Sequence, residues 1–554
     1  MRDRTDKDSE LHSKKMNRRG FLKGAAATGA MGIVAGTPLA SAQTPAAQAP
    51  AVSCRPSWEI APPPVPESEI KNTVTADVVV IGAGAAGMAT ALSAAEGGAK
   101  VVVLEKMRQF SARGFDIAAV DSREQKRLGI KIDVPQAIRE LIKSGDKQIK
   151  EELYWIWTKH SGKVMDWLLD QAEPEGLYVK LSDAQYKGPT YFEYPVTHHI
   201  LGGPHTKDAA FLDLMAIMER NAKAKGVDFR YRTPAVRLVR EGKGRVTGVL
   251  AGTSGNYTRY LAAKGVVLAT GDYGSDKEML QHYCPVATLV DANVYTPIGA
   301  NVGEGHKLGL WAGAAMQKGT HAPMIHCLGG AWPYFFLHVN NRGQRYQNED
   351  LGCQAACLGK MMQPGGVGWT VYDSNFMKYV PQTLRIGGGF FWDNPGRNMG
   401  EEWTPEEGME ALEKNIREGL AFRENTVEAL AAKMKVPADA LKKTIARHNE
   451  LVGKGVDEDY GKRKELLFPI DTPPFYAGLM KSALLATTSG LRIDATCAVL
   501  DANDEPLGGL YAVGNVQGDM FAVDYPTVFP GLSHGRCLTF GRLVGLRLAG
   551  KELA

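Results

Sequence analysis

The sequence predicts an α/β fold because three buried-strand patterns each end in a glycine-containing turn. They occupy residues 77–106, 265–271 and 508–515. Residues 77–106 predict a strand, a glycine-rich turn, a helix and a second strand, which is the order that a parallel sheet requires. The third pattern lies near the end of the chain. We therefore expect a discontinuous domain whose last strand and helix come from the C-terminus.

The segment "DVVVIGAGAAGMATALSAAEGGAKVVVLEK" carries the strongest motif of the chain. Its glycines complete a G-x-G-x-x-G pattern, which allows a tight turn and lets a pyrophosphate approach a helix N-terminus. An acid at the end of the second strand can accept hydrogen bonds from ribose hydroxyls. Strand, helix and acid together predict a dinucleotide site, with these residues at the cofactor: Gly82, Ala83, Gly84, Gly87, Glu105 and Lys106.

Two later turns favour FAD over a nicotinamide cofactor. A strand ending in "ATGD" and a late "LYAVGN" resemble the flavin-binding domains of FAD-dependent oxidoreductases. In that arrangement, the backbone near Ala235 meets the adenine, and the loop 110–122 wraps the pyrophosphate and the isoalloxazine ring. That loop contains no histidine, so the resemblance implies non-covalent FAD. The additional cofactor residues implied are Ser111, Gly114, Asp116, Ala235, Ala269, Thr270, Gly271, Asp272, Gly514 and Asn515.

The order of motifs resembles the fumarate reductase/succinate dehydrogenase flavoprotein superfamily over roughly residues 70–550. The motifs are "IGAGAAG", "ATGDYG", "GANVGEGHKLGLWAGA", "FLHVNNRGQRYQNED", "GGLYAVGN" and "LTFGRLVG". The resemblance implies a Rossmann-like FAD-binding domain with an inserted α+β capping domain, and a substrate held between them against the flavin. The predicted parts are a signal peptide at 1–42, a Pro/Ala-rich linker at 43–70, FAD-binding segments at 71–317 and 484–554, and the cap at 318–483.

The substrate residues of fumarate reductases are missing here. The place of the proton-donating arginine holds Trp332, with Tyr334 close by, and "ATTSG" at 486–490 lacks the histidine of a "HTMGG" motif. The arginine that clamps the second carboxylate is replaced by Val528. One family substrate-site histidine has a counterpart in His321. Because a small dianion needs paired cationic donors, we do not expect fumarate as the substrate.

The stretch "DYPTVFPGLSHGR", residues 524–536, instead resembles the "YPGxG" motif of 3-ketosteroid dehydrogenases. There, a tyrosine hydroxyl and a glycine N–H bind the carbonyl of an enone, although the spacing is six residues here rather than four. The predicted catalytic residues are Tyr525, Tyr334, His321, Gly531 and Arg536. Packing in the core or cap, and capping of the final helix by Arg536, remain the alternatives.

Residues 192–205, "FEYPVTHHILGGPH", predict an aromatic and histidine-rich loop at the pocket. The spacing of His198, His199 and His205 is not that of a zinc site. Cys353 and Cys357 form the only close cysteine pair and lie one helical turn apart. Such a pair is more often a packing feature than a metal ligand pair, so we predict no metal; a cluster or a disulfide is the alternative.

The N-terminal region predicts export. Arg18 and Arg19 precede a moderately apolar run, and "ASAQ" offers an Ala-x-Ala cleavage site, as in a twin-arginine signal. A Sec signal or a basic tail is the alternative. The net charge of +4 equals the excess of basic residues within residues 1–23. The remainder is neutral, so no nucleic-acid partner is expected. No later apolar run is long enough to span a membrane.

The leading hypothesis is an exported enzyme that reduces an activated C=C bond of an enone or enoate, in the periplasm or at the outer face of the cytoplasmic membrane. NAD(P)H is scarce there, and the chain has no Cys-x-x-Cys-His haem motif. Electrons are therefore expected from a separate membrane-anchored multihaem cytochrome. The alternatives are a ketosteroid or cyclic-ketone dehydrogenase that runs the reverse reaction, and a non-catalytic FAD electron-transfer subunit.

Overall fold

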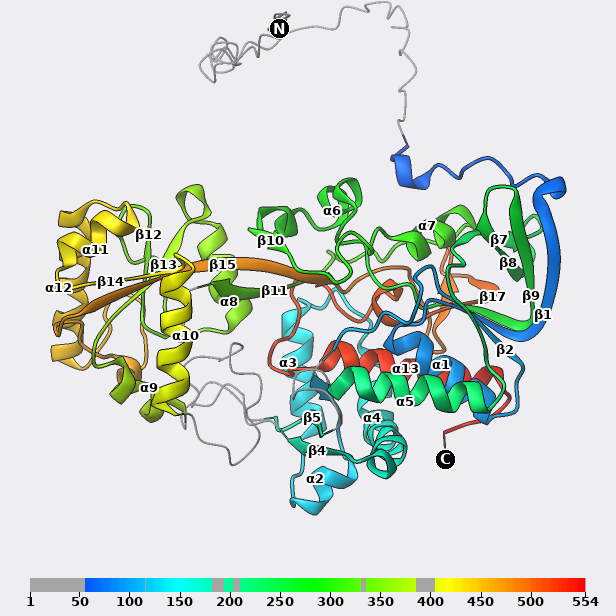
Figure 1. Ribbon diagram of the computed structural model, residues 1–554, viewed down its shortest axis with the longest axis horizontal. Coiled ribbons are helices and arrows are strands. Elements are labelled where there is room, and N and C mark those ends of the chain that lie inside the picture. Colours follow the sequence, from blue (N-terminus) through cyan, green and yellow to red (C-terminus); the bar gives the residue numbers. More distant parts are fainter. Residues whose placement is uncertain are drawn as a thin grey trace, which may run out of the picture. The chain divides into compact units, whose positions relative to one another are not determined.

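The computed structural model describes residues 55–114, 116–181, 194–202, 210–329, 335–384 and 404–553. The predicted signal peptide and the catalytic candidate Tyr334 lie outside these ranges. Within them, the chain forms two large sheets and one small sheet, with helices packed on them (Figure 1).

The larger sheet has eight strands in the order β16-β17-β9-β1-β2-β6, with β7 and β8 extending from β9. Its central strands are parallel. Val78 to Ile81 are almost fully buried, as expected for a strand covered on both faces. The strands are β1 (Ile70–Ile81), β2 (Val101–Leu104), β6 (Asp228–Arg230), β7 (Ala235–Arg240), β8 (Val246–Thr253), β9 (Asn256–Leu268), β16 (Ala498–Leu500) and β17 (Pro506–Ala512).

Helices α1 (Ala85–Glu96) and α13 (Leu532–Leu548) pack against each other, and α5 (Ala210–Ala224) contacts α1 (Figure 1). Glycines allow the α1–α13 approach. A Cβ at Gly541 would lie 2.6 Å from the carbonyl oxygen of Ala86, and one at Gly545 would lie 2.4 Å from that of Thr90. The C-terminal helix therefore completes the domain that the glycine motif begins. Helix α4 (Glu151–Ala172) packs on α13.

The second sheet has six strands, and β15 is its centre because β10, β11, β13 and β14 all pair with it (Figure 1). The strands are β10 (Ala292–Asn293), β11 (Pro323–Gly329), β12 (Leu337–Asn340), β13 (Gly368–Asp373), β14 (Ala421–Glu424) and β15 (Phe475–Thr487). The helices in this part of the chain are α8 (Cys353–Met361), α9 (Phe376–Leu384), α10 (Pro405–Arg417), α11 (Val427–Met434) and α12 (Ala438–Lys454). The sheet falls mostly within the predicted cap.

A three-stranded sheet, in the order β3-β5-β4, takes its first strand from within the predicted wrapping loop 110–122. It consists of β3 (Asp116–Ala118), β4 (Leu177–Leu181) and β5 (Thr197–Gly202). The loop interpretation of residues 192–205 is therefore wrong for 197–202, which form β5 and pair with β3 at 197–199 and with β4 at 198–202. The other helices are α2 (Arg123–Arg127), α3 (Val134–Ser144), α6 (Lys277–Tyr283) and α7 (Glu304–Trp311). The predicted α/β class is confirmed.

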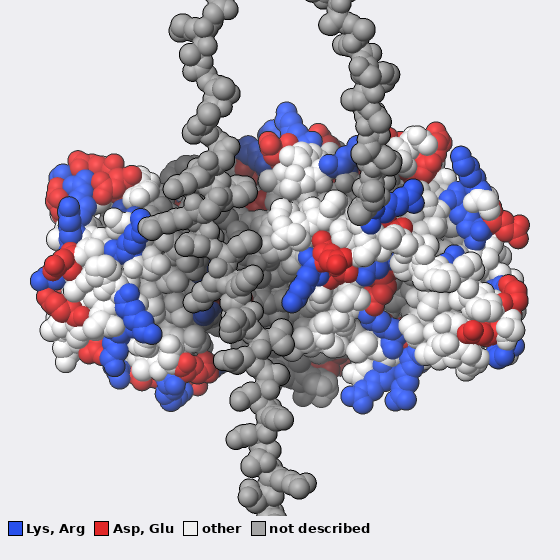
Figure 2. All heavy atoms as spheres, turned by 90° about the horizontal axis from the view of Figure 1, so that it is seen from above, with Lys and Arg blue, Asp and Glu red and all other residues white. Residues whose placement is uncertain are grey.

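On the face shown in Figure 2, acidic and basic side chains are intermixed over the described residues. This agrees with the neutral charge balance outside residues 1–23. Among the helices of the described ranges, none combines the length and apolar composition needed to cross a bilayer.

Candidate active site

One cavity lies where the turns after β1, β2, β9 and β17 meet. This is the edge at which parallel α/β sheets bind ligands. Segments separated by hundreds of residues in the sequence meet at this edge. The predicted cofactor residues that line the cavity are Gly82, Gly84, Glu105, Lys106, Ser111, Ala235, Ala269, Thr270, Gly271, Gly514 and Asn515.

The glycine turn leaves no room for side chains. Gly82 has φ +104°, and its Cβ would lie 2.4 Å from the carbonyl oxygen of Ala269. A Cβ at Gly87 would lie 1.9 Å from the carbonyl oxygen of Gly82. Among the described residues, no side chain caps the N-terminus of α1, where Gly84 is the N-cap. The first N–H groups of α1 therefore remain available to an anionic group at the cavity.

Glu105 holds the turns together from the end of β2. One carboxylate oxygen accepts the N–H of Ala83 at 2.8 Å, and the other accepts the N–H of Met107 at 2.8 Å. A carboxylate has about four acceptor positions, so these two bonds leave capacity for hydroxyl donors. Glu105 lines the cavity although only 6% of it is exposed. The arrangement suits a ribose.

Sequence reasoning missed several lining residues, including Thr233, Pro234, Arg113, Tyr295 and Glu304. The guanidinium of Arg113 lies 3.9 Å from the ring centre of Tyr295 and donates to the carbonyl oxygen of Leu485 at 2.7 Å. Glu304 bonds to the ammonium of Lys106. Arg113 belongs to the wrapping loop and Glu304 to the "GANVGEGHKLG" motif, so both carried a sequence signal. No motif in the sequence pointed to Tyr295.

The cavity fits FAD on its own chemistry. It joins two glycines that permit close backbone approach, an uncapped helix N-terminus and a buried carboxylate. Thr270 also lines it, and the buried hydroxyl of this residue has no hydrogen-bond partner among the described residues. A buried hydroxyl without a partner is costly, and a polar cofactor group would satisfy it.

The other predicted cofactor residues support the cavity without lining it. Asp272 is fully buried, and one oxygen accepts the N–H of Gly274 and the side-chain amide of Asn301, both at 2.7 Å. Burial raises the pKa of this carboxyl. Gly114 lies against the ring of Phe211. Ala83 lies in the turn after β1, and Gly87 lies in the first turn of α1.

Asp116 forms a buried pair with His199 instead of facing the cavity. The two residues are opposite each other in the β3–β5 register, and Nε2 of His199 lies 2.6 Å from a carboxylate oxygen of Asp116. The backbone carbonyl of Asp116 also accepts a hydrogen bond from His534 at 2.8 Å. Because His534 lines the cavity, this residue stands between the Asp116–His199 pair and the cavity.

In the loop 524–536, Tyr525 is 4% exposed and its hydroxyl accepts the backbone N–H of Ser533 at 2.8 Å. Burial raises the pKa of Tyr525, so the phenol stays protonated. Gly531 has φ +82° and is the N-cap of α13, and its Cβ would meet the backbone of Asp116. The loop is thus fixed against the Asp116–His199 pair.

Arg536 is fully buried in the first turns of α13. Its guanidinium donates to the carbonyl oxygen of Thr488 at 2.9 Å and to the side chain of Asn515, and it lies 4.6 Å from the ring centre of Phe521. These contacts position Asn515 at the cavity. They also mean that the guanidinium is already bonded to other parts of the protein.

His321 is buried beside Tyr273. Its Nδ1 lies 2.5 Å from the hydroxyl of Tyr273, and its ring stacks on Tyr283 with ring centres 4.8 Å apart. Nε2 has no hydrogen-bond partner among the described residues. Burial lowers the pKa of His321 to about 3, so the imidazole is neutral at physiological pH. The structure does not bring His321 into the lining of the cofactor cavity.

Comparison with known proteins decides the family. The sequence matches the FAD binding domain family over residues 77–328 and 363–526. The chain belongs to this family. Residues 15–35 match the twin-arginine translocation signal. The predicted FAD cofactor and twin-arginine export, to the periplasm or the outer face of the cytoplasmic membrane, are thereby confirmed.

Among relatives of this family member, a vinyl phenol reductase of Lactiplantibacillus plantarum is 27% identical, with 85% of this chain and 96% of the relative covered. A 3-oxosteroid 1-dehydrogenase of Mycolicibacterium smegmatis is 26% identical, with 86% and 98% covered. The structure of a flavocytochrome c3 fumarate reductase aligns with a TM-score of 0.63 and 25% identity, covering 86% of this chain and 78% of that one. The chain is an FAD-dependent reductase or dehydrogenase acting on CH–CH bonds.

Proposed function

We propose that this enzyme reduces the activated C=C bond of an enone or an enoate other than fumarate. The observation that carries the proposal is the chemistry of the loop 524–536. Its single arginine, Arg536, is buried and bonded to Thr488 and Asn515. The guanidinium of this loop is therefore already engaged within the protein, whereas a dianionic substrate would require free cations.

FAD, when bound and reduced, would supply hydride chemistry at the alkene carbon β to the carbonyl. Negative charge then develops on the carbonyl oxygen. Tyr525 is suited to stabilise it, because its hydroxyl already accepts from Ser533 and its own proton remains to be donated. The N–H of Gly531 is the second donor that we assign to this oxygen. A protein group protonates the neighbouring carbon.

The electron source that we propose is a separate cytochrome at the membrane. The supporting facts are the twin-arginine signal and the lack of a Cys-x-x-Cys-His motif in the chain. An exported enzyme has little access to NAD(P)H, and a related reductase structure is a flavocytochrome. The donor would reduce bound FAD by two electrons for each alkene.

Dehydrogenation of a ketosteroid or cyclic ketone is the second candidate. It uses the same donors at the carbonyl and moves the hydride in the opposite direction. The "YPTVFPG" segment and the 3-oxosteroid 1-dehydrogenase relative favour it. Both candidates require a substrate whose reacting carbon pair lies next to a carbonyl group.

The test uses purified holoenzyme under anaerobic conditions. Reduced viologen supplies electrons, and a panel of cyclic enones, aryl enoates and fumarate supplies acceptors. We expect turnover of at least one enone or enoate and none of fumarate. Turnover of fumarate alone would exclude the proposal. Reduction of a dye by saturated ketosteroids, without any alkene reduction, would establish the second candidate instead.

A further inference from the structure

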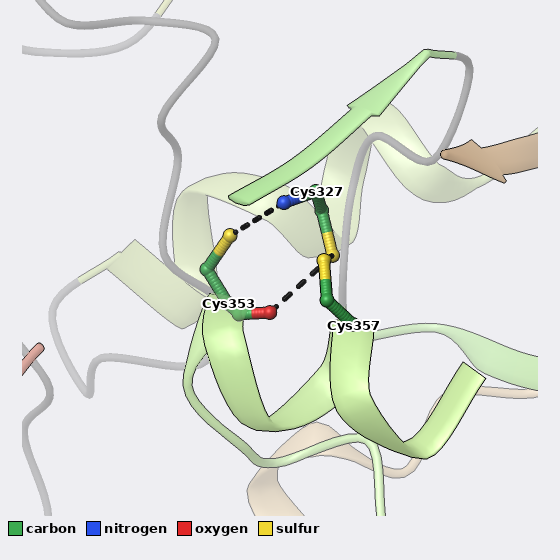
Figure 3. A group of neighbouring side chains, drawn as sticks. All are labelled: Cys327, Cys353 and Cys357. Carbon is green, nitrogen blue, oxygen red and sulfur yellow. Dashed lines mark hydrogen bonds between the residues drawn. The ribbon is translucent and has the colours of Figure 1, made fainter. Parts of the chain in front are cut away.

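Three buried cysteines from two elements meet in the second sheet (Figure 3). Cys327 lies on β11, and Cys353 and Cys357 lie on the first turns of α8. None is more than 2% exposed. Sγ of Cys357 lies 2.7 Å from Sγ of Cys327, well inside the separation of about 3.5–4.0 Å at which heavy atoms normally touch.

The start of α8 supplies hydrogen-bond partners to the edge of β11 that lies opposite β15. The side chain of Gln354 accepts the N–H of Ile325 at 2.7 Å and donates to the carbonyl oxygen of Pro323 at 3.1 Å. Two residues further along β11, the N–H of Cys327 donates to Sγ of Cys353 at 3.0 Å. Cys353 thus serves as an acceptor for the strand, which leaves Cys327 and Cys357 as the pair in direct sulfur contact.

The arrangement does not suit a metal ion. Thiolates around zinc at about 2.3 Å lie roughly 3.8 Å from one another, so the Cys327–Cys357 pair would have to separate. Within the described part of the chain, no fourth His, Cys, Asp or Glu completes the group. A bond between two sulfurs, at about 2.05 Å, requires a smaller change in their separation, and in the opposite direction.

We propose that Cys327 and Cys357 form a disulfide in the exported protein. The twin-arginine signal takes the chain to a compartment in which disulfides persist. The two thiols lose two protons and two electrons, and the S–S bond forms. The electrons reduce an external disulfide, carried by a small molecule or a dithiol oxidoreductase, to two thiols through a mixed-disulfide intermediate.

Burial makes this reaction slow and its product persistent. It raises the pKa of Cys327 and of Cys357, so both thiols are protonated in the reduced state. Because the thiolate is the nucleophile, oxidation requires a transient opening of α8 from β11. Once formed, the bond is shielded from external reductants by the same packing.

The bridge would fix α8 next to the candidate active site. Gln354 on α8 donates to a carboxylate oxygen of Asp524, the residue before Tyr525. Locking α8 onto β11 therefore holds the second sheet against the loop 524–536. The unbridged enzyme would lose part of that restraint, and we expect it to have a lower Tm.

The experiment is a peptide map of holoenzyme exported through the twin-arginine route and purified without reductant. The protein is denatured in excess alkylating agent and cut with trypsin. We expect peptides 319–342 and 346–360 to appear joined, with fragmentation placing the bond at Cys327 and Cys357 and the alkyl group on Cys353. Alkylation of both Cys327 and Cys357 would overturn the proposal. One equivalent of a soft metal per chain, with all three thiols recovered free, would also overturn it.

Two variants and a reduced sample sharpen the result. Cys353→Ser is expected to keep the joined peptides and Cys357→Ser to lose them. Protein lacking residues 1–42 and purified with reductant from cytoplasm is expected to be unbridged, and oxidised glutathione should raise its Tm to that of exported protein. No such rise should occur in Cys357→Ser. If a variant fails to fold, the wild-type map still decides.

Discussion

Tyr525 is the side chain on which the proposed chemistry depends most. Its hydroxyl is buried and held by the Ser533 N–H. We expect Tyr525→Phe to lower kcat by roughly 100- to 1000-fold, the effect of removing one donor to a developing oxyanion, while FAD remains bound. Steady-state viologen assays with an enone measure this. Tyr178→Phe, at a half-exposed tyrosine of β4, is the matched control. An unchanged kcat would remove Tyr525 from the mechanism.

Glu105 is the side chain at which the predicted cofactor site can be tested. Replacing it by glutamine turns one acceptor into a donor that faces the N–H of Ala83 or Met107. We expect Glu105→Gln to raise the Kd for FAD about 10- to 100-fold, as for loss of a hydrogen bond to a charged group. Titration of apoprotein by flavin fluorescence measures it, with the exposed Glu152→Gln as control. Equal affinities would contradict the assignment.

At the residue scale, the sequence best predicted the positions at which the backbone conformation requires a particular residue. Gly82, Gly87 and Glu105 follow from the motif because steric and hydrogen-bond requirements act within one βαβ unit. Asp116 was predicted at the cofactor, yet it pairs with His199, which follows after a long stretch of chain. Such pairing depends on strand register, and sequence spacing does not contain it.

At the scale of elements, the contact of α13 with α1 depends on glycines. A Cβ at Gly545 would lie 2.4 Å from the carbonyl oxygen of Thr90. We expect Gly545→Ala to lower the free energy of unfolding by about 1–3 kcal/mol through overpacking. A Cβ added at Gly453, near the end of α12, would have no atom within 4 Å, so Gly453→Ala should stabilise by up to about 1 kcal/mol. Urea unfolding measures both variants. If both substitutions changed the free energy of unfolding in the same direction, the packing argument would be refuted.

Element patterns in the sequence predicted the large sheet but not the small one. Strand β2 and the C-terminal ends of β1 and β9 are continuous, buried apolar runs, as burial on both faces demands. Strand β5 contains "THH", which resembles a loop. It is a strand because its backbone pairs with β3 and β4, and His198 is satisfied by Ser122 at 2.7 Å and by the carbonyl of Val196 at 2.8 Å.

At the scale of the whole molecule, buried neutral histidines make stability depend on pH. Burial lowers the pKa of His306 and His321 to about 3, and that of His198 and His448 to about 4. The unfolded chain binds these protons near pH 6.5. The free energy of unfolding therefore has its full value above pH 6.5. Below pH 6.5, it falls by about 1.4 kcal/mol for each histidine and for each pH unit.

Urea unfolding of holoenzyme at pH 7.5 and 5.0 tests this dependence. We expect a lower free energy of unfolding at pH 5.0, by several kcal/mol. His448→Gln, distant in sequence from the loop 524–536, should reduce the slope below pH 6.5 by about one proton. Equal stability at the two pH values would show that these histidines are accessible to protons.

The overall arrangement was predictable because the FAD motifs must converge on one ligand, whatever their separation in the chain. The substrate was not predictable, because a pocket depends on side chains from several elements, and the predicted residue Tyr334 lies outside the described residues. The exact limits of the cap remain a prediction for the same reason: β15 runs from the cap sheet to Thr487, beside the turns at the cavity.

The most direct measurement is a single turnover of the bound flavin. Holoenzyme is reduced anaerobically with a stoichiometric reductant and mixed with a cyclic enone while the FAD absorbance is followed. The proposed function predicts return of the oxidised spectrum, with one saturated product formed per FAD. It is contradicted if the flavin stays reduced with every enone and enoate tested while saturated ketones bleach the oxidised enzyme.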